Sequence, residues 1–404
     1  MSANVPGTRN RPGMRWLLPE GIEEALPQSA ARLERLRRRL LDVYSRWGYE
    51  LVIPPLIEYL DSLLIGAGDD LELDTFKLVD QRSGRMMGLR ADMTPQVARV
   101  DAHRLSRPVP TRLCYVGSVV HTRPGPFGGG RSPLQVGAEL YGHGGLEADV
   151  EVVELLLTTL DEARVSGPLC LDLGHVGIVR GLAAKTGIGE ADEAALFEML
   201  QRKSTPDIGT YIDGLELDAE SDAMWRSLID LHGDRSVLTR AREALAAAGP
   251  DVLGAIDYLE RIGECLVQRH PELQLHFDLA ELRGYHYHTG VVFAVFVPGE
   301  GEEIARGGRY DGIGEAFGWA RPATGFSTDL RRLIALGSEA LPAGPGAIAA
   351  PAENDPALTA RIRELRSAGE RVIAMLPGQQ GGPGELGCDR QLVRREDNWT
   401  VEEL

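Results

Sequence analysis

The sequence predicts an α+β protein in which a mainly antiparallel sheet is flanked by helices and interrupted by a helical insertion. Short β-rich runs joined by hairpin-like turns occur along most of the chain, whereas residues 188–270 show helical periodicity and few strand signals. Strands and helices do not alternate regularly, so a doubly wound α/β fold is not expected. The predicted strands cover residues 76–78, 86–89, 114–120, 135–141, 169–173, 275–278, 291–296 and 323–327.

Apolar residues recur at helical spacing over 33–47, which predicts the first helix. Ser29 is its expected N-cap, and Gly48 stands where a C-terminal cap belongs. A proline pair at 54–55 then interrupts a β-rich run and favours an edge strand, where another subunit could bind. Further helices are predicted over 94–105, 149–163, 175–185 and 329–336.

Changes in composition divide the chain into domains. Residues 1–14 are rich in Pro, Gly and Asn and are expected to form a disordered leader. The sheet domain is expected over 15–187 and 271–338, on either side of the helical insertion at 188–270. A Pro- and Gly-rich linker, LPAGPG, then precedes a small C-terminal α/β unit, residues 346–404, for which a βαββ order is predicted.

Composition excludes several classes of protein. Among 404 residues, 60 acidic residues outnumber 43 basic ones, and the resulting formal charge of −17 disfavours nucleic acid as a partner. No apolar run is long enough to span a membrane, and the first residues lack the apolar stretch of a secretory signal, so a cytoplasmic protein is expected. The four cysteines are too widely spaced for a disulfide framework or a zinc site.

Polar side chains gather in two segments that are predicted to be adjacent strands, 281–290 (ELRGYHYHTG) and 304–312 (IARGGRYDG). They carry arginines, histidines, tyrosines and a paired glycine. This combination predicts a small polar pocket. An amino-acid pocket needs carboxylates for the ammonium group, hydrogen-bonding side chains and a closely approaching backbone.

Motifs from Gly48 to Leu333 resemble those of histidyl-tRNA synthetase, a class II synthetase, in the same order and with similar spacing. GYELVIPPLIE resembles the family's first motif, LRADMT its LRPEGT loop, LQVGAE its HQLGCE strand, LRGYHY its LVRGLDYY segment and ARGGRYDG its AGGRYDG segment. The resemblance implies a class II synthetase-like core with a histidine pocket. In that pocket Asp92, Thr94 and Gln135 would hold the amino group, Glu139 would accept from the imidazole, Arg283 would lie near the carboxylate, and Tyr287, Gly307 and Gly308 would shape the wall.

The nucleotide-binding positions depart from the synthetase pattern. His121 and Arg123 stand where the family has an arginine for the α-phosphate and a glutamate for the adenine. A histidine cannot replace a bidentate guanidinium on phosphate, and an arginine reverses the contact with the adenine amino group. The third motif keeps Arg332 but has Asp329 in place of a glycine and Arg331 in place of an acid. A carboxylate near a triphosphate repels it, so loss of adenylation is predicted.

The C-terminal unit, residues 346–404, has seven arginines, no lysine and ten acids, and it therefore lacks a basic face for an RNA stem. A retained histidine pocket, altered nucleotide motifs and no anticodon domain together resemble the regulatory subunits of ATP phosphoribosyltransferase. That resemblance implies a subunit without catalysis or cofactor, which pairs with the short-form catalytic subunit in the first step of histidine biosynthesis. It further implies a homodimer within a hetero-octamer and inhibition by L-histidine, bound in the pocket or at the contact with the catalytic subunit. The alternative is a divergent histidyl-tRNA synthetase or an adenylating paralogue.

Other polar residues favour structural roles. His286 and His288 share one face of a predicted strand, but no third ligand is evident, so no metal site is expected. Asp172 and His175 could suggest acid–base chemistry. A structural or interfacial role is the preferred interpretation, because a general base needs a positioned substrate.

Overall fold

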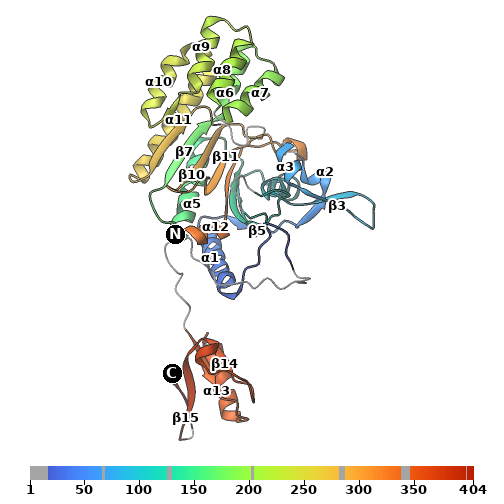
Figure 1. The fold of residues 1–404 in the computed structure, drawn as a ribbon, viewed down its shortest axis with the longest axis vertical. Helices are drawn as coiled ribbons and strands as arrows, with labels where there is room; N and C mark the ends of the chain where they lie inside the picture. Colours follow the sequence, from blue (N-terminus) through green and yellow to red (C-terminus); the bar gives the residue numbers. More distant parts are fainter. Residues whose placement is uncertain are drawn as a thin grey trace. The chain divides into compact units, whose positions relative to one another are not determined.

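The computed structural model of the chain describes residues 17–65, 69–124, 130–201, 204–281, 287–337, 346–396 and 398–404. The chain divides into two compact units, Met1–Ser338 and Glu339–Leu404. Helices flank a large, mainly antiparallel sheet in the first unit, as the predicted α+β class requires (Figure 1).

This sheet has nine strands in the order β1-β5-β6-β12-β11-β10-β7-β9-β8. Neighbouring strands are antiparallel except for the parallel pairs β1/β5 and β7/β9. The strands are β1 (Glu50–Leu51), β5 (Thr111–Ser118), β6 (Leu134–Tyr141), β7 (Cys170–His175), β8 (His232–Gly233), β9 (Gln274–Asp278), β10 (Val291–Phe296), β11 (Ala305–Arg309) and β12 (Ala323–Asp329).

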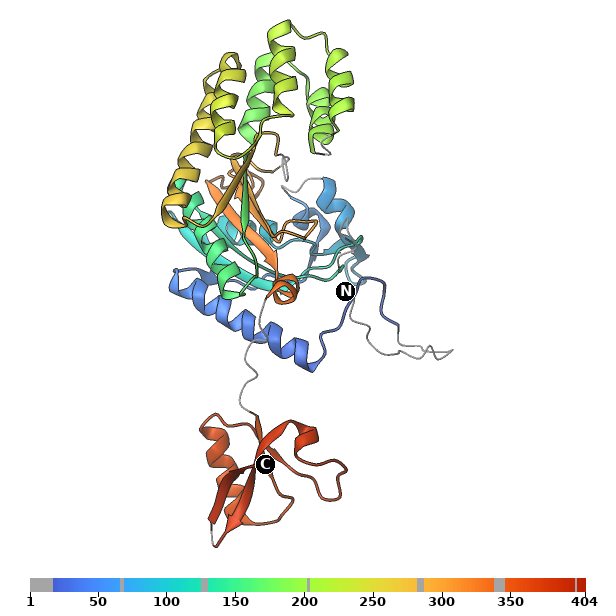
Figure 2. The same cartoon turned by 60° about the vertical axis from the view of Figure 1, so that its left-hand side comes forward.

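Three helices cover one face of the sheet: α1 (Pro27–Arg46), α5 (Leu146–Glu162) and α12 (Leu330–Leu336) (Figure 2). The Tyr44 hydroxyl of α1 lies 3.0 Å from Thr159 Oγ1 of α5, inside this layer. The predicted N-cap at Ser29 is wrong, since α1 begins at Pro27, whose fixed φ suits the first helical position. Gly48 follows the helix with a φ of 82°, as a C-terminal cap requires.

A separate three-stranded sheet has the order β2-β4-β3. The predicted edge position of the segment after Gly48 is confirmed, because β1 and β2 are each the outermost strand of their sheet. The helix predicted over 94–105 changes to π geometry after Arg99. The elements here are β2 (Ile57–Tyr59), α2 (Leu60–Leu63), α3 (Asp69–Asp74), β3 (Phe76–Val79), β4 (Met86–Leu89), α4 (Thr94–Arg99) and the π-helix η1 (Val100–Leu105).

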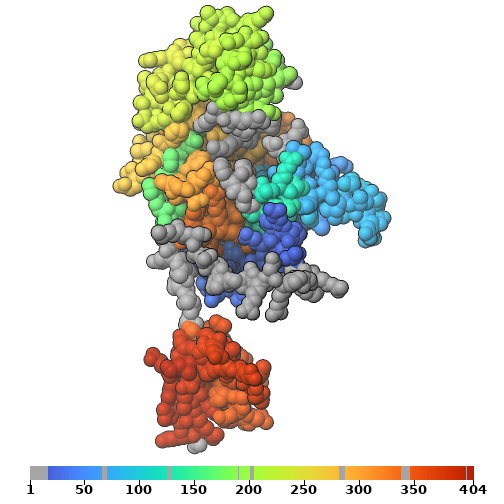
Figure 3. All heavy atoms as spheres, in the orientation of Figure 1, coloured from blue at the N-terminus to red at the C-terminus, as the bar shows by residue number. Residues whose placement is uncertain are grey.

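Apart from connecting turns and the short strand β8, the described residues between 188 and 270 are helical, and they form a lobe at the top of the view in Figure 3. Helix α11 joins this lobe to the sheet domain, since it contacts α5, α6 and β7. Helix α6 (Val176–Thr186) precedes the lobe. The helices of the lobe are α7 (Glu190–Gln201), α8 (Thr205–Asp213), α9 (Ala219–Leu228), α10 (Ser236–Ala244), the 3₁₀-helix η2 (Ala246–Ala248) and α11 (Pro250–Arg269).

A strand was predicted over 281–290, but the described residues 287–290 are not part of a strand. Residues 287–290 form a turn that leads into β10, and residues 282–286 lie outside the described ranges. The Thr289 N–H donates to the Arg309 carbonyl at 2.7 Å. A Cβ at Gly290 would lie 3.0 Å from Arg309 Cδ, so glycine gives this arginine room. Residues 287–290 therefore turn beside the end of β11. The regular pairing with β11 begins at Val292 in β10. After β11 comes the 3₁₀-helix η3 (Glu315–Phe317).

The second unit is a four-stranded sheet in the order β14-β13-β15-β16 with one α-helix. Its core contains Ile348, Leu358 and Trp399. The predicted βαββ order missed the last strand, in which Trp399 points inward between polar neighbours. The elements are β13 (Ala347–Ala350), α13 (Pro356–Ser367), β14 (Val372–Ala374), the 3₁₀-helix η4 (Gly384–Leu386), β15 (Cys388–Arg395) and β16 (Asn398–Glu403). Over the described ranges of both units, no helix has the length and apolar character to cross a membrane.

Candidate amino-acid-binding site

The centre of the large sheet forms the floor of a pocket. Gly325 of β12 pairs with Glu139 of β6 on one side and with Gly308 of β11 on the other. A Cβ at Gly325 would lie 1.5 Å from Glu139 Oε2, and a Cβ at Gly308 would lie 2.7 Å from the Val291 carbonyl oxygen. Glycine at both positions therefore leaves space for the Glu139 carboxylate and for a ligand above the strands.

About 310 Å³ of space between the lining side chains is continuous with solvent, so the pocket is an open hollow and not an enclosed cavity. Six residues predicted from the sequence line it together: Asp92, Thr94, Glu139, Tyr287, Gly307 and Gly308. Six further lining residues were not predicted: His288, Arg306, Tyr310, Gly325, Phe326 and Ser327. The period-two alternation of a strand through ARGGRYDG could have identified Arg306 and Tyr310, because they share the face of Gly308.

Glu139 is buried at the base of the pocket, where three hydroxyl groups donate to its carboxylate. Tyr115 donates to Oε1 at 2.9 Å and Thr94 at 3.1 Å, while Tyr310 donates to Oε2. Burial raises the pKa of Glu139 to about 8, and the hydroxyl donors oppose this rise. A ligand that brings a nitrogen donor or a positive charge to this carboxylate would relieve the cost of its burial.

Asp92 lies in the loop before α4 and presents a second carboxylate to the pocket. Its Oδ1 accepts from the Thr94 backbone N–H at 3.0 Å and from Gln135 Nε2 at 2.8 Å. Gln135 is not a lining residue in the described part of the chain, although it was predicted as a direct ligand contact. It holds Asp92 in place, and its contact with a ligand stays a prediction. Arg283, which was predicted near the carboxylate, lies outside the described residues.

Two altered nucleotide positions are used within the fold. His121 Nε2 lies 2.9 Å from the Ala91 carbonyl oxygen. Asp329 is half-buried and caps α12, and its Oδ1 accepts from the backbone N–H groups of Leu134 and Arg331, each at 3.0 Å. Burial raises the pKa of Asp329 despite these bonds. Both side chains are thus engaged in hydrogen bonds within the protein.

Two arginines of the third motif are also engaged by other groups. Arg332 donates to the carbonyl oxygens of Glu302 and Glu303 at 3.0 and 2.9 Å and forms ion pairs with Glu300 and Glu302. Arg331 donates to the Glu23 carbonyl oxygen at 3.4 Å. The glutamates at 300–303 therefore bind the guanidinium of Arg332, the arginine that this chain shares with the synthetase motif. Arg123, at the second altered nucleotide position, is exposed.

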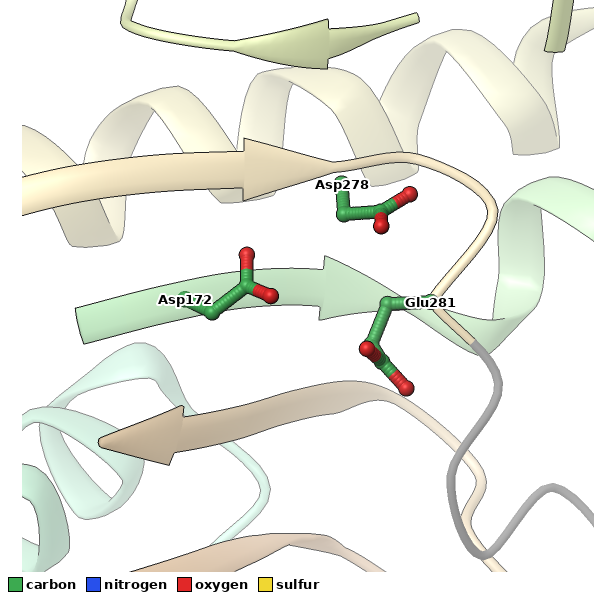
Figure 4. A group of neighbouring side chains, drawn as sticks. All are labelled: Asp172, Asp278 and Glu281. Carbon is green, nitrogen blue, oxygen red and sulfur yellow. The ribbon is translucent and has the colours of Figure 1, made fainter. Parts of the chain in front are cut away.

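His175 and Asp172 have contacts consistent with the structural interpretation. His175 is the N-cap of α6, where its Nδ1 accepts the Gly177 N–H at 3.1 Å, and burial lowers its pKa to about 4. Asp172 lies 2.8 Å from His276 Nδ1. Asp172 also meets Asp278 and Glu281, with one carboxylate oxygen of each within 4.8 Å of the others (Figure 4). Asp278 and Glu281 have further interaction partners, so we assign no cation to these acids.

Two family models match the chain. The model described as histidyl-tRNA synthetase matches residues 21–333. The model described as the ATP phosphoribosyltransferase subunit HisZ C-terminal domain matches residues 345–402. The two matches meet near the division between the two structural units.

Curated relatives match over almost their whole length. The ATP phosphoribosyltransferase regulatory subunit of Thioalkalivibrio sulfidiphilus is 59% identical over 391 residues, which cover 96% of this chain and 99% of that protein. The protein of the same name from Alkalilimnicola ehrlichii is 56% identical over 393 residues, which cover 96% of this chain and 98% of that protein.

Solved structures confirm the predicted class II synthetase-like fold. The ATP phosphoribosyltransferase regulatory subunit/histidyl-tRNA synthetase from Bacillus halodurans has a TM-score of 0.81 at 26% identity and covers 93% of this chain and 96% of its own. The histidyl-tRNA synthetase from Nostoc sp. has a TM-score of 0.76 at 18% identity and covers 96% of this chain and 95% of its own, a likeness of fold alone.

Proposed function

Because the chain belongs to the family of ATP phosphoribosyltransferase regulatory subunits, we propose that it binds L-histidine and transmits this binding to the short-form catalytic subunit. The catalytic subunit would depend on it for activity, and histidine would inhibit the complex in the first step of histidine biosynthesis. Such regulation requires that histidine binds the inhibited and active states of the complex with different affinity.

The observation that carries this proposal is the pair of carboxylates in one pocket. Asp92 would accept from the ammonium group of histidine, and Glu139 would accept from its imidazole N–H. Tyr287, Gly307 and Gly308 would form the wall, as the sequence predicted. Charge-assisted hydrogen bonds at both ends of the ligand would select an amino acid with a basic side chain.

We propose that the subunit has no catalytic activity of its own and needs no cofactor. Adenylation requires groups that stabilise charge on a transferring phosphate. Asp329 caps α12, Arg332 is held by the glutamates at 300–303, and His121 lies against the Ala91 carbonyl. These contacts favour a role in binding over a role in adenylation.

We also propose a homodimer within a hetero-octamer, located in the cytoplasm and without nucleic acid as a partner. The edge strand β1 and the residues after it expose apolar side chains, among them Leu51 and Ile53, of which Ile53 is 80% exposed. Exposed apolar side chains beside an unpaired strand edge favour contact with another chain.

Two measurements test the proposed function. The first mixes the chain with the short-form catalytic subunit and follows complex formation by size-exclusion chromatography with light scattering, and activity with and without L-histidine. We expect a heteromer, a rise in activity and inhibition by histidine. A catalytic subunit whose mass and rate do not change on mixing would contradict the regulatory role.

The second measurement addresses the alternative, a divergent histidyl-tRNA synthetase or an adenylating paralogue. Histidine-dependent exchange of pyrophosphate into ATP reports formation of an adenylate. We expect no exchange by the isolated chain. Exchange at a rate typical of synthetases would favour the enzymatic alternative.

A further inference from the structure

Arg306 is a pocket residue to which neither the motif resemblance nor the altered nucleotide positions give a role. It precedes the glycine pair of β11 and is paired with Ser327 of β12. Successive side chains of a strand point to opposite faces, so Arg306 shares the face of Gly308 and of Tyr310, the residue that follows β11. The Tyr310 hydroxyl bonds to Glu139, which shows that this face is the pocket floor.

We infer that the guanidinium of Arg306 binds the carboxylate of the amino-acid ligand. The inference rests on the proposed function, since it assigns a subsite within the same pocket. It gives Arg306 a ligand group that Asp92 and Glu139 cannot bind, because both of them are carboxylates.

The position of Asp92 supports this assignment. The ammonium and carboxylate groups of an α-amino acid share one carbon, so a ligand whose ammonium contacts Asp92 places its carboxylate close by. Arg306 and Asp92 line the same pocket, and the charge of Asp92 acts on the Arg306 guanidinium. A carboxylate beside Asp92 would be repelled unless a cation adjoined it. Arg306 provides that cation.

Arg306 is also available to a ligand. Its side chain is 66% exposed, and its ion pair with Glu303 is long, at 3.5 Å. Exposed pairs of this kind contribute little, so the guanidinium can turn to a carboxylate with which it makes two parallel hydrogen bonds. The neighbouring Arg309 is held by Asp149, at 3.0 Å from both Nε and Nη2. No other arginine is found among the described residues that line the pocket.

The test compares two ligands that differ only at the carboxylate. Isothermal titration calorimetry on the full chain would use L-histidine and L-histidinol, in which a hydroxymethyl group replaces the carboxylate. We expect the native chain to bind histidine at least about tenfold more tightly, as befits a hydrogen bond between charged groups. Arg306→Gln should weaken histidine binding by about ten- to 100-fold and change histidinol binding by less than about twofold. The histidine affinity of Arg306→Lys should lie between those of the native chain and Arg306→Gln, because lysine keeps the positive charge but cannot make two parallel hydrogen bonds to a carboxylate.

The matched control is Arg235→Gln, which removes an exposed, ion-paired arginine at the residue before α10. It should leave both affinities unchanged. Equal loss of both ligands in Arg306→Gln would overturn the inference, because a wall residue would act on either one. Selective loss of histidine in Arg283→Gln, with Arg306→Gln unaffected, would also overturn it and assign the carboxylate to Arg283. A native chain that binds neither ligand would overturn the proposed function itself, an outcome distinct from a change in ligand preference.

Discussion

Gln135 holds Asp92 by donating its side-chain N–H to the carboxylate at 2.8 Å, while its carbonyl oxygen accepts the Met93 backbone N–H at 3.0 Å. Both ends of the amide are thereby used on the loop that carries Asp92. The orientation of this carboxylate toward the pocket depends on a residue of β6 that does not line the pocket. We therefore expect Gln135 to act on a bound ligand through Asp92.

We predict that Gln135→Ala weakens histidine binding by about tenfold, as loss of a hydrogen bond to a charged group would. Because Gln135 acts through Asp92, the double variant with Asp92→Asn should bind no more weakly than Asp92→Asn alone. Titration calorimetry on the four proteins measures this coupling. Gln274→Ala, at an exposed position on β9, is the control. Additive losses would indicate a direct contact between Gln135 and the ligand.

Gly325→Ala should destabilise the sheet domain and abolish histidine binding. The added methyl would lie 1.5 Å from Glu139 Oε2, so the carboxylate or the strand must move. Overpacking of this kind costs about 1–3 kcal/mol. Thermal unfolding and calorimetry would measure the two effects. The matched control is Gly312→Ala, where no atom lies within 4 Å of the added Cβ. If Gly325→Ala behaved like this control, the close approach of Glu139 would be contradicted.

The sequence carried enough local information to predict the fold class and most of the pocket. Alternating apolar runs and hairpin turns follow from strand geometry, so β5, β6, β10 and β12 were predicted close to their observed positions. The motif at 304–312 brought Gly307 and Gly308 to the pocket because a strand fixes which face its residues occupy. Short elements were missed. Strand β8 has two residues and is defined by its pairing with β9.

Contacts between distant segments were not predictable from local patterns. The three hydroxyl groups on Glu139 come from β5, from the start of α4 and from the residue after β11, and they converge only in the register of the folded sheet. The capture of Arg332 by the glutamates at 300–303 depends on the conformation of a loop. For Gln135, the motif resemblance indicated a position in the pocket. It could not reveal the hydrogen bond to Asp92, which lies 43 residues away in the sequence.

Histidine affinity should depend on pH through Glu139. Burial raises the pKa of Glu139 to about 8, whereas a free imidazole has a pKa of about 6.5. The hydrogen bond between the Glu139 carboxyl group and the imidazole of histidine should be strongest when the two groups share one proton. Affinity should therefore be greatest between about pH 6.5 and 8. It should fall above about pH 8, where the charged imidazolium–carboxylate pair forms only with uptake of a proton and the neutral imidazole offers a single uncharged N–H. Calorimetric titration from pH 5.5 to 8.5 measures this profile.

The control for the pH profile is Glu139→Gln, which keeps the size of the side chain but cannot titrate. Its histidine affinity should be lower, and its remaining binding should lose the decline at alkaline pH. A decline of the same size in Glu139→Gln would assign the proton to another group, such as the amino group of the ligand.

Arg309→Gln should reduce the stability of the sheet domain by about 3–5 kcal/mol, because it leaves a buried carboxylate without its cation. Asp149 is fully buried, and its Oδ2 accepts from Arg309 at 3.0 Å and from the Tyr258 hydroxyl. Its Oδ1 has no hydrogen-bond partner among the described residues. Denaturant unfolding monitored by fluorescence measures the loss. The double variant with Asp149→Asn should recover part of it, since no uncompensated charge is left. A more exposed arginine supplies the comparison: the Arg242 side chain is 32% exposed against 7% for Arg309, and Arg242→Gln, which removes ion pairs on α10, should cost less than about 1 kcal/mol. Similar losses in the two single variants would contradict the importance of burial at Asp149.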